Sequence, residues 1–219
     1  QAPAGPLAGR TIAIPETREL EVFATMLERR GATVVRCPLV AIRDAPDPAA
    51  VLDWCGRFAG GACDDLILLT GEGLRRLMKV VRRLDVEKPF IEALAPARKF
   101  ARGPKPVRAL RELGLEAQVI TEKPTSEGIA ETLGKLDLKG RRLGLQLYPE
   151  KDHAVLIDAI TAQGASVDTV LPYVYDSRAA DANIVAAIEE MAAGRIDAIA
   201  LTNQVQVRRL VHTARAKGL

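Results

Sequence analysis

Short apolar runs alternate with amphipathic segments along most of this 219-residue chain. Such runs are typical of buried strands, whereas the longer segments carry apolar residues at helical spacing. The pattern predicts strands at 11–15, 33–37, 66–69, 97–101, 116–120, 142–147, 167–170 and 198–201. It predicts helices at 19–30, 48–58, 72–83, 104–113, 125–136, 152–162, 180–193 and 204–216. Strands and helices that alternate in this way form parallel sheets with right-handed crossovers.

This order of elements occurs twice. The first copy begins at Gly9 with GRTIAIPETRELEVFATMLERRGATVVRCPLVAI. The corresponding segment of the second copy begins at Gly140 with GRRLGLQLYPEKDHAVLIDAITAQGASVDTVLPYVY. Further along, the first copy continues with DDLILLTGEGLRRL, which corresponds to IDAIALTNQVQVRRL in the second. Self-similarity of this kind predicts two related structural units. A cleft between such units is a common place for a ligand.

The strands divide unequally between the two predicted lobes. Five fall in the middle of the chain, enough for a small doubly wound sheet, and three fall at its ends. We expect one lobe over 43–171, a discontinuous lobe over 1–37 and 177–219, and linker strands at 38–42 and 172–176. FARGPKPVRALRELGLEAQVI follows the first copy, whereas the second reaches Leu219 without a counterpart. The terminal lobe is therefore expected to be incomplete at its C-terminal side.

Composition narrows the class of protein. Hydrophobic residues make up 48% of the chain and aromatic residues only 4%, which favours aliphatic α/β cores. A net charge of +3 argues against a nucleic-acid surface in this segment but does not exclude a small anion. Cys37, Cys55 and Cys63 form no CxxC pair and are expected to be reduced thiols of a cytoplasmic protein. We expect no membrane segment and no secretory signal before Gly9.

Other polar and aromatic features have ordinary interpretations. His153 and His212 have no ligand partners at metal spacing and are expected at the surface. Trp54 is expected in the core of an amphipathic helix. ARGPKP lacks the spacing of a phosphate-binding loop.

Several segments, taken in order, resemble the uroporphyrinogen-III synthase family. They are GRTIAIPETR, RRGATVV, DDLILLTGEGLRRL, ARGPKPVRALRELGLEA, PTSEGIAETL, QGASVDTVLPYVY and DAIALTNQVQVRRL, between Gly9 and about Ala216. The resemblance implies two flavodoxin-like lobes with parallel sheets, one inserted in the other and joined by two antiparallel linker strands. It also implies a monomeric lyase of tetrapyrrole and heme biosynthesis that needs no metal or cofactor. Such an enzyme cyclises hydroxymethylbilane to uroporphyrinogen III, with loss of water and inversion of ring D.

The resemblance also indicates site residues. Tyr173 matches the family's linker tyrosine near the leaving hydroxyl, although Tyr175 lies only two positions away. A phenol there can donate a proton or a hydrogen bond, and the alternative role is plain packing between lobes. Thr70 and Thr202 end equivalent strands, so their hydroxyls and nearby N–H groups can hold substrate carboxylates. The alternative is that both are simple helix N-caps.

Further candidates for binding substrate carboxylates follow other strands. Arg18 comes after the first strand, where an exposed helix-start arginine is the alternative. Arg102, Gly103 and Lys105 lie at a strand-to-helix turn suited to an anion, or to solvated charges. Thr125 and Ser126 match a family segment with hydroxyls at a helix start, although capping alone explains them. Gly71 and Asn203 complete the set, because each follows one of the paired threonines.

The chain departs from the family pattern at these turns. Family members commonly have Thr-Ser where this chain has Thr70-Gly71 and Thr202-Asn203, and Pro106 replaces a family threonine. The departures motivate a second hypothesis, a non-catalytic tetrapyrrole-sensing module that is fused to a DNA-binding segment beyond Leu219. A third is a receptor of the periplasmic-binding type for another anion, which the expected lack of a signal peptide disfavours.

Overall fold

The chain folds into two compact α/β units in this computed structural model, which describes residues 5–17, 19–149, 151–176 and 178–218. Unit 1 comprises Gln1–Arg43 and Tyr175–Leu219, and unit 2 comprises Asp44–Val174. The boundaries fall within two short strands, β3 (Ala41–Asp44) and β9 (Tyr173–Asp176), which pair as an antiparallel two-stranded sheet. The α/β class and the pair of antiparallel linker strands that the sequence predicts are confirmed.

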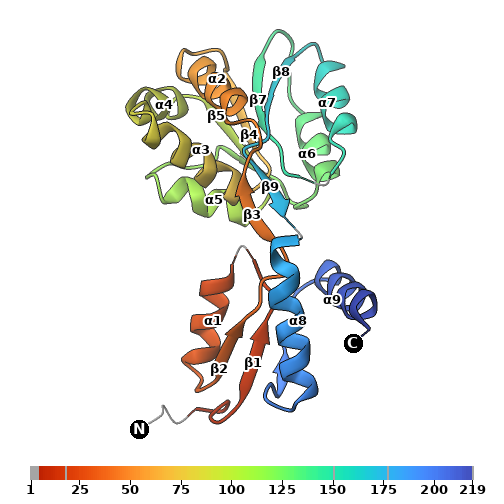
Figure 1. Cartoon of the computed structure of the whole chain (residues 1–219). Coiled ribbons are helices and arrows are strands. Elements are labelled where there is room, and N and C mark those ends of the chain that lie inside the picture. The colour runs from red at the N-terminus through yellow and green to blue at the C-terminus, as the bar shows by residue number, and fades with distance from the viewer. Residues whose placement is uncertain (1–4, 18, 150, 177, 219) are drawn as a thin grey trace. The chain divides into compact units, whose positions relative to one another are not determined.

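The sheet of unit 2 has five parallel strands in the order β6-β5-β4-β7-β8 (Figure 1). They are β4 (Asp65–Leu68), β5 (Arg98–Ala101), β6 (Val119–Ile120), β7 (Arg142–Gln146) and β8 (Ser166–Val170). Each lies within a run that the sequence predicts as strand, apart from one residue at the start of β4 and one at the start of β8. The central strand β4 is buried along its whole length, as expected for a parallel strand that is covered on both faces.

Two groups of helices cover the two faces of this sheet. Leu66 and Leu68 of β4 pack with α2 (Pro48–Ala59), α3 (Gly71–Arg83), α4 (Glu87–Leu94) and α5 (Pro104–Arg111). Ile67, which points the other way, packs with α6 (Ser126–Leu133) and α7 (Ala154–Thr161). The alternation along one strand therefore divides the core of unit 2 into two layers.

Helix α4 is the one element of unit 2 that the pattern does not predict. Its third residue is Pro89, which suggests a loop, but the first turn of a helix tolerates proline because its N–H groups have no partner in the helix. The buried Lys99 binds the end of α4, where its Nζ donates to the carbonyls of Leu94, Ala95 and Ala97 at 2.9, 2.9 and 2.6 Å. Burial lowers the pKa of this ammonium group.

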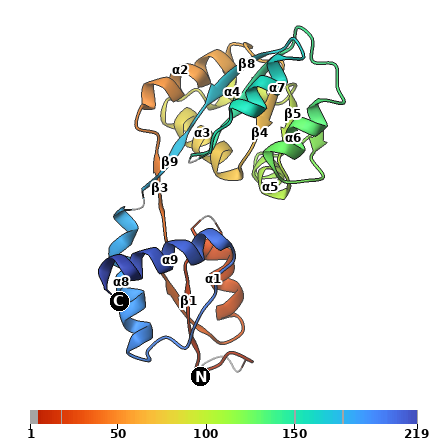
Figure 2. The same cartoon turned by 90° about the vertical axis from the view of Figure 1, so that its right-hand side faces the viewer.

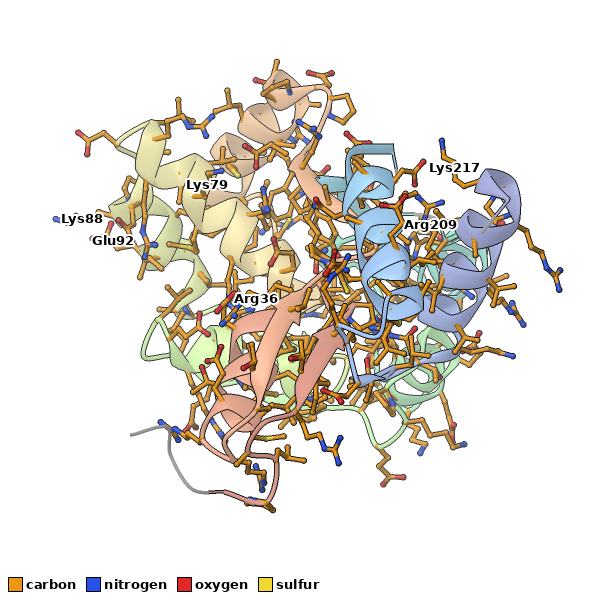
Figure 3. The ribbon with its side chains drawn as sticks, turned by 60° about the horizontal axis from the view of Figure 1, so that its bottom comes forward. Arg36, Lys79, Lys88, Glu92, Arg209 and Lys217 are labelled. Atoms are coloured by element: carbon orange, nitrogen blue, oxygen red, sulfur yellow. The ribbon has the colours of Figure 1, made fainter. Side chains whose placement is uncertain are left out.

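Unit 1 has a three-stranded parallel sheet in the order β10-β1-β2. Its elements are β1 (Thr11–Ile14), α1 (Leu20–Glu28), β2 (Thr33–Arg36), α8 (Arg178–Ala192), β10 (Ala198–Ile199) and α9 (Gln204–Lys217). Helices α1 and α8 lie on opposite faces of this sheet (Figure 1, Figure 2). Arg209, labelled in Figure 3, ties α9 to its own unit, since it donates to the Asp181 carboxylate and to the Leu39 carbonyl.

Two predictions about single residues have opposite outcomes. Trp54 is 1% exposed, so its predicted place in the core is confirmed. His153 is 7% exposed, so its predicted place at the surface is wrong. His153 precedes α7, and its ring packs edge-on against Tyr148 with 4.8 Å between the ring centroids. No helix within the described residues has the length and apolarity needed to cross a membrane.

An ion-pair cluster closes the amino end of the central strands, and we expect it to make stability depend on pH. Asp65 is fully buried, and the guanidinium groups of Arg98 and Arg141 each bind both of its carboxylate oxygens, at 2.6–3.1 Å. Burial alone would raise the pKa of Asp65, but hydrogen bonds from Arg141 and Arg98 outweigh it and hold that pKa below its ordinary value. Its stabilising effect is therefore present above about pH 4 and lost as the pH falls through the folded-state pKa.

Replacing Asp65→Asn is expected to cost about 2 kcal/mol of unfolding free energy near neutral pH, because two arginines lose their carboxylate. Urea unfolding of both proteins at about pH 7 and at about pH 3 tests this. We expect the difference between them to shrink in acid. A difference that is independent of pH would contradict the role given to the Asp65 carboxylate.

Candidate functional site

Most of the predicted site residues lie at the carboxyl edge of the five-stranded sheet. In a parallel sheet this edge also holds the N-termini of the helices that follow each strand, and ligands bind there. Unit 2 contains Thr70, Gly71, Arg102, Gly103, Lys105, Thr125, Ser126 and Tyr173. Thr202 and Asn203 follow β10 in unit 1. Arg18 lies outside the described residues.

Tyr173 and Thr70 form the buried centre of this edge. Tyr173 is fully buried, and its hydroxyl oxygen lies 3.2 Å from Thr70 Oγ1. Thr70 is the N-cap of α3 and accepts a hydrogen bond from the Gly73 N–H at 3.0 Å. Tyr175 is half-buried and lies on the same face of β9 as Tyr173 by alternation, but it belongs to unit 1 and is two residues further from Thr70. The arrangement places a phenol and a capping hydroxyl side by side at one helix N-terminus.

Gln146 belongs to the same centre, and the sequence analysis missed it. It is fully buried at the end of β7, and its Oε1 accepts from the Thr70 N–H at 2.9 Å. A polar residue that ends a strand directly after the apolar run LGL was the available signal. That signal says nothing of its partner, since Thr70 is far away in sequence.

Gly71 explains one departure from the family pattern. A Cβ atom built on this residue would lie 2.6 Å from the backbone oxygen of Lys105, at the start of α5. The N-termini of α3 and α5 therefore approach so closely that a serine does not fit at position 71 without a shift of backbone. Pro106, the second departure, is buried within the first turn of α5.

Arg102 and Gly103 form the next turn of the edge. Gly103 has a φ of +83°, which favours glycine, and a Cβ there would lie 2.9 Å from Pro124 Cβ. The guanidinium of Arg102 stands over the ring of Tyr148, 4.4 Å from its centroid. This cation–π contact holds a positive charge at the edge of the sheet. Lys105, in the first turn of α5, is exposed.

The start of α6 supplies hydrogen-bonding groups. Thr125 is the N-cap and accepts from the Gly128 N–H at 3.0 Å, so its predicted capping role is confirmed. Ser126 Oγ and His153 Nδ1 are buried and have no hydrogen-bond partner among the described residues. The other ring nitrogen of His153 lies 2.9 Å from the Tyr148 carbonyl oxygen. Ser126 Oγ, with the N–H groups of the helix, suits an acceptor such as a carboxylate.

In unit 1 the N-cap of α9 is Asn203, which accepts from the Gln206 N–H at 3.0 Å. The alternative role of Thr202 as a cap is therefore wrong. Arg75 follows Thr70 by five positions but Arg208 follows Thr202 by six, so one added residue moves the cap to Asn203. Thr202 Oγ1 instead donates to the Glu16 carboxylate at 2.7 Å. Glu16, which the sequence analysis missed, places a negative charge beside a predicted anion-binding residue.

The cysteines are poor candidates for nucleophiles. All three are free thiols. Burial raises the pKa of Cys37 and of Cys63 to about 11 and that of Cys55 to about 12, so each is protonated near neutral pH. The chemistry of this site therefore rests on hydroxyl, amide and cationic groups.

Comparisons with known proteins agree with this architecture. A family model described as uroporphyrinogen-III synthase HemD matches residues 21–218. The uncharacterized protein YjjA of Bacillus subtilis (strain 168) is 29% identical over 212 residues, which cover 97% of this chain and 77% of that protein.

Solved structures are similar as well. A mutant uroporphyrinogen III synthase from Thermus thermophilus matches with a TM-score of 0.60 and 29% identity, over 94% of this chain and 77% of its own. The wild-type enzyme from the same organism matches with a TM-score of 0.53 and 28% identity, over 96% of this chain and 78% of its own.

Proposed function

Because the chain belongs to the uroporphyrinogen-III synthase family, we propose that it cyclises hydroxymethylbilane to uroporphyrinogen III with inversion of ring D and loss of water. The family match over 21–218 carries this proposal. The paired hydroxyls of Thr70 and Tyr173 support it, since they bring a proton donor to the edge where ligands of parallel sheets bind.

Departure of hydroxide from the substrate leaves a delocalised cation, and we assign the assistance of this step to the Tyr173 phenol. The substrate's many carboxylates are held by cations and by the N–H groups of helix N-termini. The residues proposed for this are Arg18, Thr70, Gly71, Arg102, Gly103, Lys105, Thr125, Ser126, Thr202 and Asn203. The protein's remaining task is to hold a flexible chain in its productive shape, which is catalysis by proximity and preorganised dipoles. It stays a prediction that the enzyme is monomeric and cytoplasmic and that it has no cofactor, metal or nucleic-acid partner.

A second candidate function is a non-catalytic module that binds a tetrapyrrole. The Glu16 carboxylate favours it, because a negative charge beside Thr202 opposes a substrate carboxylate there. The absence of a hydroxyl at Pro106 favours it too.

Product analysis distinguishes the two functions. The full chain is incubated with freshly generated hydroxymethylbilane, and the uroporphyrin isomers are separated after oxidation. The proposal predicts isomer III above the isomer I that forms spontaneously. Isomer I alone from a folded protein that binds the porphyrin would reject the enzyme and favour the sensing module.

A further inference from the structure

The side-chain amide of Gln146 is oriented by its surroundings. Its Oε1 accepts from the Thr70 N–H at 2.9 Å, and its Nε2 donates to the Leu147 carbonyl. The opposite orientation would put the amide NH₂ against an N–H and its oxygen against a carbonyl. Gln146 Oε1 therefore faces Thr70 and can only accept there.

Gly73 makes room for this amide. A Cβ atom on Gly73 would lie 2.0 Å from Gln146 Cδ, so no other residue fits while Gln146 stays in place. Gly73 is the third residue of α3, and in a capping box a side chain at that position binds the N–H of the N-cap residue. Here that position has no side chain, and Gln146 binds the Thr70 N–H from a different strand.

The same amide sets the direction of the hydroxyl hydrogen bonds. Thr70 Oγ1 lies 3.3 Å from Gln146 Oε1, 3.2 Å from the Tyr173 hydroxyl oxygen and 3.0 Å from the Gly73 nitrogen. Thr70 has a single hydroxyl hydrogen, and Gln146 Oε1 has none to offer. When Thr70 donates to Gln146, its oxygen is left as an acceptor, and the Tyr173 phenol donates to it.

We propose that Gln146 is a positioning residue, which holds Thr70 as a hydrogen-bond acceptor and thereby orients the phenol hydrogen of Tyr173. The proposal rests on the proposed function in so far as Tyr173 serves the leaving hydroxyl, a step in which the phenol hydrogen turns from the Thr70 oxygen to the leaving oxygen. It goes beyond that function by assigning a third member to the group and a direction to its hydrogen bonds. Gln146 acts through Thr70, and no contact with the substrate is required of it.

The first test measures the ¹³C chemical shift of Tyr173 directly and does not depend on enzyme activity. The chain has three tyrosines, so labelling their Cζ atoms with ¹³C gives three resonances that Tyr→Phe variants assign. We expect Gln146→Leu to move the Tyr173 resonance to lower chemical shift, because a phenol that no longer donates has less phenolate character. The Tyr148 and Tyr175 resonances are expected to stay in place.

Two further variants make this test decisive. Gly73→Ala displaces Gln146 without removing any polar group, and we expect it to move the Tyr173 resonance in the same direction. Gln206→Leu is the matched control, since Gln206 Oε1 accepts the Thr202 N–H at 2.7 Å in unit 1, and it should leave that resonance unmoved. A Tyr173 resonance that stays in place in a folded Gln146→Leu or Gly73→Ala protein would overturn the proposal.

The second test is a double-mutant cycle on turnover. Gln146→Leu is expected to lower kcat about fivefold to tenfold with a smaller change in KM, as for the loss of one hydrogen bond. In a Tyr173→Phe background the same change should have almost no effect on kcat, because Gln146 acts through the phenol. Equal losses in both backgrounds would show a merely structural role. If the unaltered chain forms no isomer III, the proposed function fails, and the resonance test still decides the role of Gln146.

Discussion

Replacing Tyr173→Phe is expected to lower kcat about 100-fold, because the change removes the group proposed to assist departure of hydroxide. Phenylalanine keeps the ring in its fully buried place, and Thr70 keeps its hydrogen bonds to Gln146 and Gly73. KM should change little, since the substrate is held mainly through its carboxylates. Steady-state formation of isomer III by the two proteins is the measurement.

Tyr175→Phe is the matched control for this prediction. Tyr175 lies two residues further along the same strand, and the same single oxygen is removed. We expect its kcat to stay within about twofold of the unaltered value. Full activity of Tyr173→Phe would reject the role of that phenol, and a large loss in Tyr175→Phe instead would move the role to Tyr175.

Replacing Trp54→Ala is expected to have the largest effect on stability, about 4 kcal/mol. Trp54 is 1% exposed, and its ring stacks on Phe58 with 5.2 Å between centroids. Its Nε1 donates to the Asp168 carbonyl at 3.1 Å, which ties α2 to β8. It also packs against Gly144 of β7, where a Cβ would lie 3.0 Å from the indole ring. The alanine variant therefore leaves a large cavity and loses the hydrogen bond to the Asp168 carbonyl.

Thermal unfolding followed by circular dichroism measures this loss, which corresponds to a fall in Tm of about 10 °C. Trp54→Phe serves as the control. It keeps an aromatic ring against Phe58 and loses the hydrogen bond to Asp168, so we expect a cost of about 1.5 kcal/mol. An alanine variant within about 1 kcal/mol of the unaltered protein would contradict the packing described for α2.

Local patterns were enough to predict most of the fold. Strands such as β4 and helices such as α3 carry their own periodicity, and the repeated order of elements indicated two units. The sequence pattern did not predict helix α4, because Pro89 lies in its first turn and the residues that stabilise the helix belong to other elements. Phe90 and Leu94 are fully buried in a layer formed by other helices, and Lys99 binds the carbonyls at its end.

The candidate site was less predictable because its contacts join distant parts of the chain. Thr70 was found from a strand end, but its partners Gln146 and Tyr173 come from other strands. Gly71 looked like a loss of function, whereas the nearby backbone of Lys105 shows that packing excludes a larger residue. Thr202 looked equivalent to Thr70 until the structure placed the cap one residue later, at Asn203.

Turnover with protein at far lower concentration than hydroxymethylbilane tests the central claim most directly. The account predicts many molecules of uroporphyrinogen III per molecule of protein, with the isomer III fraction rising as more protein is added. An isomer III yield that never exceeds the amount of protein, or a product that is isomer I at every protein concentration, would contradict it.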